Sequence, residues 1–372
     1  MKIFMVVGAR PNFIKVAPLH RALSKCSNVV PRIIHTGQHF DFAMSGIFFE
    51  QLELPTPDYF LGVGAGTHTQ QTAAIMVEFE KVIQTEKPDL VMVVGDVNST
   101  LACALVCAKE NIPVAHIEAG LRSGDRTMPE EINRIITDSI SDQLFVTEKA
   151  GVENLLKENI ASERIHFVGN LMIDTLARHL PQIDQMNLIG KLGLCSGDYI
   201  LMTMHRPVNV DDLAGLTRIL QIIKALSAEQ TIVFPMHPRT RKNILMLGLL
   251  RDFEEVKGLK MLEPQGYFEF LNLIKNSRIV LTDSGGIQEE TSYLRVPCIT
   301  LRETTERPVT VEEGTNYLLP DFDTHSILNK VNEINAVKLK KGQIPAFWDG
   351  NTAERIVAIL REKYFNSYVC DK

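Results

Sequence analysis

The chain has 372 residues, which is enough for about two domains that each bury a sizeable core. Hydrophobic residues make up 45% and charged residues 23% of it, the composition of an ordinary globular protein. The formal net charge of -6, without a long basic run, argues against a nucleic-acid partner but leaves small anions as ligands.

The first residues and the cysteines indicate the cellular compartment in which the protein works. The segment MKIFMVVGARPNF is too short, and too soon interrupted at Gly8 and Arg10, to be a secretory signal. No apolar stretch reaches the roughly 20 residues of a membrane helix. The six cysteines are scattered and form no CxxC pair, which is typical of small buried hydrophobes. We therefore expect a protein of the reducing cytoplasm without a membrane partner.

Short Val- and Ile-rich runs alternate with longer stretches of helical periodicity along the whole chain. This alternation predicts an α/β fold with parallel sheets that helices cover on both faces. In chain order, the runs that we expect to be strands are residues 2–7, 29–36, 89–94, 112–118, 143–147 and 165–168 in the first half, and residues 199–204, 231–236, 278–282 and 297–301 in the second.

The pattern breaks around residues 170 to 190, where polar residues, a proline and a glycine follow GNLMIDTL. We therefore predict two doubly wound, Rossmann-like domains, residues 1–170 and 171–351. A last helix over residues 352–372 is left free to pack back on the first domain. Ligands of such sheets bind outside the carboxyl ends of the strands, so two facing domains would place the site in a deep cleft between them.

The end of the first strand leads into GARPNFIK, where Pro11 suits a first helical turn and two cations, Arg10 and Lys15, lie near the helix start. The segment matches neither GxGxxG nor GxxxxGK(S/T), so a nicotinamide site or a P-loop is not indicated. Cations beside a helix N-terminus oppose the helix dipole, and an anion between them would remove that conflict. The alternative is a helix start whose cations are solvated.

Three acidic residues follow later strands of the first half. Asp96 stands in GDVNST, Glu118 ends an apolar strand, and Glu130 follows Pro129 in a predicted first helical turn. Asp96 also fits a helix cap and Glu130 a complement to the dipole, whereas Glu118 needs partners because it closes a buried strand. Together they would place three carboxyl groups in one site, where crowding raises at least one pKa and prepares a group for proton transfer.

The segment DSGGIQEE places Ser284, Gly285 and Gly286 at a predicted helix start. Glycines let a ligand approach closely, and the free N–H groups of a helix start suit a phosphate. The two glutamates that follow, Glu289 and Glu290, would then accept hydrogen bonds from hydroxyls, as acidic residues do with ribose. A ribonucleoside diphosphate satisfies both features, and a capped helix with an acidic first turn is the alternative.

Other strand ends of the second half carry His205 and Arg307, which would extend a cationic lining, although a lone histidine at a strand end is more often structural. Phe270, in GYFEFLNLI, offers a ring for a base to stack on, whereas aromatic residues at helical spacing are usually core. No HExxH or comparable ligand set appears, so we expect no metal and no other cofactor. No GxSxG is present, which disfavours a serine hydrolase.

Several motifs occur in the order seen in a known family: GARPNFIKVAP, HTGQHFD, VVGDVNST, HIEAGLRSGDRTMPEEINR, VGN, MHRPVNVD, HPRT, LTDSGGIQEE and LRETTERPVTVEEGTN. From residue 1 to about residue 320 the chain resembles the non-hydrolysing UDP-N-acetylglucosamine 2-epimerases. The resemblance implies a GT-B-like fold, as in two-domain nucleotide-sugar glycosyltransferases, and a homodimer that binds a UDP-sugar.

The resemblance also implies roles for particular residues. Ser284, Gly285 and Gly286 would bind the diphosphate, Glu290 the ribose hydroxyls, and Phe270 would lie against the uracil. The residues that match the phosphate and sugar region are Arg10, Lys15, His205 and Arg307. Asp96, Glu118 and Glu130 match the catalytic carboxylates, and His205 is expected to be catalytic with them.

The implied reaction is the reversible inversion of C2 in a UDP-N-acetylhexosamine, UDP-GlcNAc to UDP-ManNAc, for surface polysaccharide precursors. UDP would leave by anti elimination to a 2-acetamidoglucal and then add back, because the C2 hydrogen is not next to a carbonyl. Two related substrates stay open, a UDP-2,3-diacetamido uronic acid and a UDP-N-acetyl-6-deoxyhexose. So do a hydrolysing epimerase, a GT-B glycosyltransferase and a nucleotide-sugar sensor without turnover.

The chain departs from the family pattern at Asn12, where glutamate is frequent, and at Pro207 and Val208, where a glutamate often follows the HR pair. It also has QHFDFAM where some bacterial members have QHRxM in a site for an activating substrate molecule. We therefore expect that Gln38 and His39 do not form a regulatory site.

Overall fold

The computed structural model describes residues 1–37, 49–320, 322–336 and 342–365. It divides into two compact units, Met1–Arg178 with Ala346–Lys372, and His179–Pro345. The chain passes from the first unit to the second within the helix α7 (Leu171–Asp184). Among the described residues, no helix combines the length and the apolar character needed to cross a membrane.

Among the described residues, seven parallel strands form the sheet of the first unit: β1 (Lys2–Val7), β2 (Val30–His35), β3 (Tyr59–Phe60), β4 (Leu90–Val94), β5 (Val114–Ala119), β6 (Gln143–Val146) and β7 (Ile165–Phe167). They lie in the order β3-β2-β1-β4-β5-β6-β7. The central strands β1, β4 and β5 are apolar runs buried on both faces, the pattern of a parallel sheet covered by helices.

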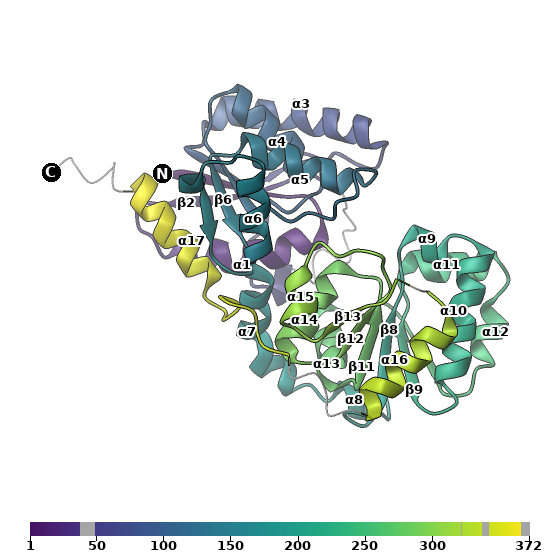
Figure 1. The fold of residues 1–372 in the computed structure, drawn as a ribbon. Coiled ribbons are helices and arrows are strands. Elements are labelled where there is room, and N and C mark those ends of the chain that lie inside the picture. Colours follow the sequence, from purple (N-terminus) through teal and green to yellow (C-terminus); the bar gives the residue numbers. More distant parts are fainter. Residues whose placement is uncertain (38–48, 321, 337–341, 366–372) are drawn as a thin grey trace. The chain divides into compact units, whose positions relative to one another are not determined.

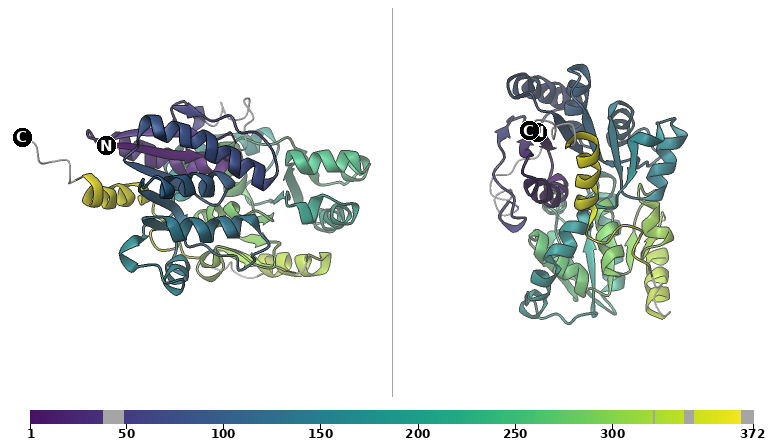
Figure 2. Two further views of the ribbon diagram at one scale, coloured as in Figure 1. Left: turned by 90° about the horizontal axis from the view of Figure 1, so that it is seen from above. Right: turned by 90° about the vertical axis from the view of Figure 1, so that its left-hand side faces the viewer.

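Helices flank this sheet (Figures 1 and 2). They are α1 (Arg10–Ser24), α3 (His68–Glu86), α4 (Asn98–Lys109), α5 (Pro129–Ile140), α6 (Lys149–Lys157) and α17 (Thr352–Leu360), with the 3-10 helix η1 (Ser162–Arg164) and the π-helix η2 (Arg361–Phe365). The helix α17, from the far end of the chain, packs along α1. Asp174 fixes its start, because the carboxylate accepts the N–H groups of Thr352 and Ala353 at 3.1 and 2.7 Å.

In the described part of the second unit, six parallel strands form the sheet: β8 (Tyr199–Thr203), β9 (Thr231–Pro235), β10 (Leu259–Leu262), β11 (Ile279–Thr282), β12 (Cys298–Thr300) and β13 (Asn316–Leu318). Their order is β10-β9-β8-β11-β12-β13. The helices are α8 (Leu188–Lys191), α9 (Pro207–Val210), α10 (Leu213–Leu226), α11 (Pro238–Met246), α12 (Leu250–Glu254), α13 (Tyr267–Asn276), α14 (Gly285–Leu294), α15 (Pro308–Glu312) and α16 (Thr324–Ala336).

The predicted class, an α/β fold with two doubly wound parallel sheets, is confirmed. All ten predicted strands are present, with ends that differ by one or two residues. The sequence did not reveal β3, β10 and β13, which are edge strands of their sheets. They are two to four residues long and mostly half-buried, so they lack the continuous apolar run that marks a central strand.

Candidate active site

Several candidate site residues of the first unit lie near the carboxyl ends of β1, β4 and β5. β4 is followed by Gly95 and Asp96, Glu118 is the second-to-last residue of β5, and α1 begins after β1. Because β1 pairs with β4, and β4 with β5, all in parallel, these ends lie at one edge of the sheet. This edge is where an open α/β sheet binds its ligand.

Glu118 has a backbone conformation that glutamate rarely adopts. Its φ is +71°, in the left-handed region, and the pairing of β5 with β6 is irregular between Ile117 and Ala119. Such a conformation costs of order 1–3 kcal/mol and persists only where the surroundings impose it. The side chain is 5% exposed and forms an ion pair with the ammonium group of Lys15. The fold therefore holds the Glu118 carboxylate in a fixed position, where it pairs with Lys15.

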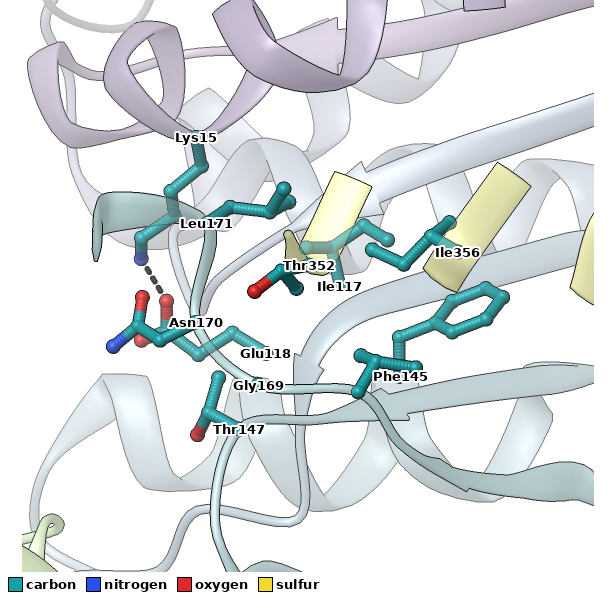
Figure 3. A pocket seen from close by; sticks show the side chains of 11 residues that line it. Lys15, Ile117, Glu118, Phe145, Thr147, Gly169, Asn170, Leu171, Thr352 and Ile356 are labelled. Carbon is teal, nitrogen blue, oxygen red and sulfur yellow. Dashed lines mark ion pairs between the residues drawn. The ribbon is translucent and has the colours of Figure 1, made fainter. Parts of the chain in front are cut away.

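Lys15 reaches Glu118 from α1, as Figure 3 shows. The lysine is itself 6% exposed, so the pair is largely removed from water. The sequence suggested Lys15 as a ligand of an anion, and in the structure its ammonium group pairs with the Glu118 carboxylate. Both residues line a small pocket of about 10 Å³, together with Thr147, Asn170 and Thr352, the last of which comes from α17.

Asp96 and Glu130 line a second, larger cavity of about 350 Å³ with His68, Gln71 and Asn133. The Asp96 carboxylate accepts a hydrogen bond from Arg134 Nη1 at 2.7 Å and its side chain is 32% exposed. The structure thus brings two of the three predicted carboxyl groups into one cavity and places Glu118 in the other pocket.

The neighbouring glutamates at the start of α5 have different surroundings. Glu131 is buried and accepts the N–H groups of Ser123 and Gly124 at 2.9 and 3.0 Å, so it anchors the loop before the helix. Glu130 is half-buried and faces the cavity. Of the two, Glu130 is the one placed to meet a ligand.

The start of α1 explains one departure from the family pattern. Asn12 Oδ1 accepts the N–H groups of Gly8 and Ala9 at 3.0 and 2.9 Å, and its Nδ2 donates to the Val94 carbonyl at 3.0 Å. An uncharged amide therefore ties the helix start to the end of β4. Arg10, at the first position of the helix, is exposed. Gln38 and His39 lie outside the described residues.

The second unit places its glycine-rich turn where α14 begins. Ser284, Gly285 and Gly286 are half-buried at this start. A Cβ at Gly285 would lie 3.0 Å from Arg307 Nη1, so glycine lets the guanidinium come close to the helix start. A Cβ at Gly286 would meet nothing within 4 Å, so there is open space in front of that residue.

Arg307 is held by Glu289, whose Oε1 accepts from Arg307 Nε at 2.7 Å. Arg307 Nη1 is also 3.5 Å from Glu306, and Arg302 donates to both oxygens of Glu306 at 2.8 and 2.6 Å. Burial disfavours the charged form of Glu306, but Arg302 and Arg307 outweigh it and lower its pKa to about 2. The charge of Arg302 is therefore balanced within the protein.

Glu290 and Phe270 are the other predicted ligands of the nucleoside. Glu290 lies on α14 and is 4% exposed. On α13, Phe268 is buried against His179, with ring centroids 4.7 Å apart, whereas Phe270 is only half-buried. The exposure of the two rings agrees with a core position for Phe268 and leaves Phe270 as the ring available for stacking.

His205 lies after β8, and its Nδ1 is 2.8 Å from Asp283 Oδ1. Asp283 is fully buried and also accepts the N–H of Arg206 and the amide of Asn209, both at 2.9 Å. Burial raises the pKa of this carboxyl, but the bonds from His205, Asn209 and Arg206 together lower it below its usual value. The carboxylate thereby fixes the His205 ring, which is 39% exposed.

Comparison with known proteins identifies the chain. The model of the family described as UDP-N-acetylglucosamine 2-epimerase matches residues 21–361. The chain belongs to the non-hydrolysing UDP-N-acetylglucosamine 2-epimerase family. It is 45% identical to the UDP-N-acetylglucosamine 2-epimerase of Methanocaldococcus jannaschii, over 97% of this chain and 99% of that one. It is also 44% identical to a UDP-2,3-diacetamido-2,3-dideoxy-D-glucuronate 2-epimerase of Pseudomonas aeruginosa, over 86% and 88%.

Solved structures agree with this membership. The crystal structure of the M. jannaschii enzyme in complex with UDP-GlcNAc and UDP matches the epimerase with a TM-score of 0.88 and 44% identity, over 97% of this chain and all of that one. The enzyme of Neisseria meningitidis bound to UDP-GlcNAc has the same TM-score at 31% identity, over 97% and 100%. The epimerase is therefore an isomerase with a GT-B-like fold.

Two partner residues of this epimerase escaped the sequence reasoning. Arg134, which holds Asp96, stands in PEEINR, three residues after Glu131 on the same helical face. Asp283, which holds His205, directly precedes the glycine-rich turn. An acidic residue at the end of an apolar strand is a usable signal for a buried partner, but the sequence does not say which residue it meets.

Proposed function

We propose that this epimerase interconverts UDP-N-acetylglucosamine (UDP-GlcNAc) and UDP-N-acetylmannosamine (UDP-ManNAc) by inverting C2 of the sugar. The observation that carries the proposal is the set of carboxyl groups of the first unit: Asp96 and Glu118 at strand ends, and Glu130 at the start of α5. They occur in a chain that is 44% identical to an enzyme crystallised with UDP-GlcNAc and UDP. Positioned acids and bases of this kind transfer protons.

The proposed route is an elimination followed by an addition. The C2 hydrogen is not next to a carbonyl, so its direct removal would leave an unstabilised carbanion. Instead, the electron pair of the C2–H bond forms the C1=C2 double bond while the C1–O bond breaks and UDP leaves with that bond's electrons. UDP then adds back to C1 of the 2-acetamidoglucal, and a proton delivered to the opposite face of C2 gives the epimer.

The carboxyl groups of the first unit would accept and return the proton. The ion pairs with Lys15 and Arg134 favour the charged, proton-accepting forms of Glu118 and Asp96. Glu130 shares its cavity with Asp96, so a second carboxyl group is available there. Inversion requires groups on both faces of the ring, which a set of three carboxyls permits and a single one does not.

The second unit would hold the nucleotide and stabilise the departing diphosphate. The N–H groups at the start of α14, together with Arg307 and His205, suit an anion that gains charge as the C1–O bond breaks. In this proposal one substrate molecule contacts both units, with its uracil on Phe270 and its ribose hydroxyls on Glu290. As further parts of the proposal, the enzyme is a cytoplasmic homodimer and supplies surface polysaccharide precursors.

The reaction is tested by proton NMR of the enzyme with UDP-GlcNAc in deuterated water. We expect UDP-ManNAc with deuterium at C2, in equilibrium with UDP-GlcNAc. Product without deuterium at C2 would exclude the elimination route. Free sugar and UDP in place of a UDP-sugar equilibrium would indicate a hydrolysing enzyme, and tight UDP binding without turnover would indicate a sensor. Full activity of Asp96→Asn and Glu118→Gln would favour a glycosyltransferase.

A second substrate is favoured by the P. aeruginosa relative, which is named for a UDP-2,3-diacetamido uronic acid and is 44% identical to this chain. That sugar carries an acetamido group at C3 and a carboxylate at C5, so it needs additional polar contacts in the site. A panel of UDP-GlcNAc, this uronic acid and a UDP-N-acetyl-6-deoxyhexose, compared by kcat/KM, decides between them. We expect the highest value for UDP-GlcNAc.

A further inference from the structure

A buried group of charged residues lies behind the strand ends that carry Asp96 and Glu118. Its centre is His116, on β5, which is fully buried. His116 Nδ1 is 2.6 Å from Asp138 Oδ1, and His116 Nε2 is 2.8 Å from the carbonyl oxygen of Gly95. Neither His116 nor Asp138 takes part in the chemistry proposed above.

The two contacts define the protons of the His116 ring. A carbonyl oxygen only accepts hydrogen bonds, so Nε2 must carry a hydrogen to bond Gly95. An ionised carboxylate also only accepts, so Nδ1 must carry a second hydrogen to bond Asp138. A ring that donates from both nitrogens is an imidazolium cation.

The surroundings of Asp138 favour its ionised form. Its second oxygen, Oδ2, lies 2.7 Å from Arg122 Nη2 and accepts the N–H of Gly120 at 3.1 Å. The Arg122 guanidinium and the Gly120 N–H, neither of which depends on the charge of His116, both favour the charged carboxylate. Arg122 in turn donates to both oxygens of Glu158, at 2.8 and 2.7 Å. With a charged His116, the group has two cations and two anions.

The hydrogen bonds of His116 and Asp138 reach residues next to the proposed catalytic carboxyl groups. Gly95 directly precedes Asp96, and its turn, with φ of +70°, is bonded to β5 through Gly95 N–H and the Ile117 carbonyl at 3.0 Å. Gly120 follows Glu118 by two residues and is bonded to Asp138. His116 and Asp138 therefore connect the two segments from which Asp96 and Glu118 project.

We propose that His116 is a doubly protonated positioning residue, which with Asp138 sets the spacing of the Asp96 and Glu118 carboxyl groups for proton transfer at C2. This inference rests on the proposed function, because it assigns a purpose to that spacing. It predicts that a residue without contact to the substrate controls the chemical step and not the binding of the nucleotide.

The protonation is tested on the unaltered protein by nitrogen-15 NMR of the histidine rings at pH 7.5. His116, assigned by comparison with His116→Gln, should show hydrogens on both ring nitrogens. Two neutral rings serve as references in the same spectrum, because burial lowers the pKa of His35 and of His166 to about 4. A His116 ring with one unprotonated nitrogen would overturn the proposal, whether or not any variant folds.

The positioning role is tested by the rate of C2 hydrogen exchange into solvent. In His116→Gln we expect a fall of about 100-fold, the effect of a displacement of order 1 Å at a reacting group. The affinity for UDP, measured by calorimetry, should be unchanged, as should both quantities in the matched control His166→Gln. His166 is a strand histidine of the same unit that bonds Gln143 at 2.8 Å.

Two failures remain distinguishable. A His116→Gln enzyme that exchanges the C2 hydrogen as fast as the unaltered enzyme, or that loses UDP affinity in proportion to its rate, would contradict the positioning role. Absence of exchange in the unaltered enzyme with every UDP-sugar of the panel would instead contradict the proposed function.

Discussion

Replacing Lys15 by methionine removes the cation that pairs with Glu118 and nearly preserves the length of the side chain. Both side chains are buried, at 8% and 5% exposure, so the carboxylate would lose the counter-charge of Lys15 in a poorly hydrated site. Breaking a buried ion pair on one side costs about 3–5 kcal/mol. The variant can avoid that cost only if Glu118 takes up a proton in the folded state.

The free-energy cost of protonating Glu118 depends on pH, and it determines how much stability Lys15→Met loses. A glutamate in water has a pKa of about 4.3, so keeping it protonated costs about 1 kcal/mol at pH 5 and about 4 kcal/mol at pH 7. We therefore expect the free energy of unfolding of Lys15→Met to lie about 1 kcal/mol below that of the unaltered protein at pH 5, and about 3–4 kcal/mol below it at pH 7. The sign follows from linkage, because the folded variant holds a proton that the unfolded chain has lost.

The assay is urea unfolding followed by tryptophan fluorescence. Trp348 is the single tryptophan of the chain, belongs to the first unit and is 1% exposed. Its Nε1 donates to the carbonyl of Thr147, whose side chain lines the pocket of Glu118, so its emission reports on this region. Urea is uncharged and leaves electrostatic interactions unscreened.

The matched control is the double variant Lys15→Met with Glu118→Gln, which removes both charges. The difference between its free energy of unfolding and that of the unaltered protein should be nearly independent of pH. A constant deficit in Lys15→Met between pH 5 and 7, or the same pH dependence in the double variant, would refute the reasoning that the pair is a buried ion pair in the folded protein.

Three further predictions concern other parts of the molecule. Gly286→Ala should leave stability unchanged, since a Cβ there meets nothing within 4 Å, but should weaken UDP binding in calorimetry by about tenfold, or ~1.4 kcal/mol; unchanged affinity would exclude the diphosphate from this turn. Burial raises the pKa of Asp174 to about 6, so the unfolding free energy should fall by up to about 3 kcal/mol between pH 4 and pH 6, and in Asp174→Asn this slope should disappear from urea titrations. Glu131→Ala removes the acceptor of the Ser123 and Gly124 N–H groups, so hydrogen exchange of that loop should accelerate while the strands keep their protection; an equally protected loop would count against the anchor.

The sequence was sufficient for the central strands of both sheets but missed three of the four edge strands, β3, β10 and β13. A parallel strand buried on both faces, such as LVMVV in β4, needs a continuous apolar run, and that run is visible without a structure. The edge strand β10, LKML, is half-buried along its length and gives no such signal. Strand-end residues such as Glu118 were also recognisable, because a charged residue that closes an apolar strand needs a reason.

The partners of those residues were not recognisable. Lys15 near a helix start was interpreted as an anion ligand, because helix chemistry is local, whereas its ion pair with Glu118 joins α1 to β5, which are far apart in the chain. His116 and Asp138 were passed over for the same reason, since their contact arises only when α5 packs on the sheet. Tertiary pairing of charges far apart in the chain leaves no spacing pattern in one sequence.

The central claim is that a single UDP-sugar is held by its diphosphate at the start of α14 while its hexose ring lies among the carboxyl groups of the first unit. A crystal structure of the enzyme with UDP-GlcNAc tests this directly. We expect oxygens of the β-phosphate within about 3 Å of the Gly285 and Gly286 nitrogens, and carboxyl oxygens of Asp96, Glu118 or Glu130 within hydrogen-bonding reach of the atoms around C1 and C2. A bound molecule whose hexose lies away from all three carboxyl groups would contradict the account.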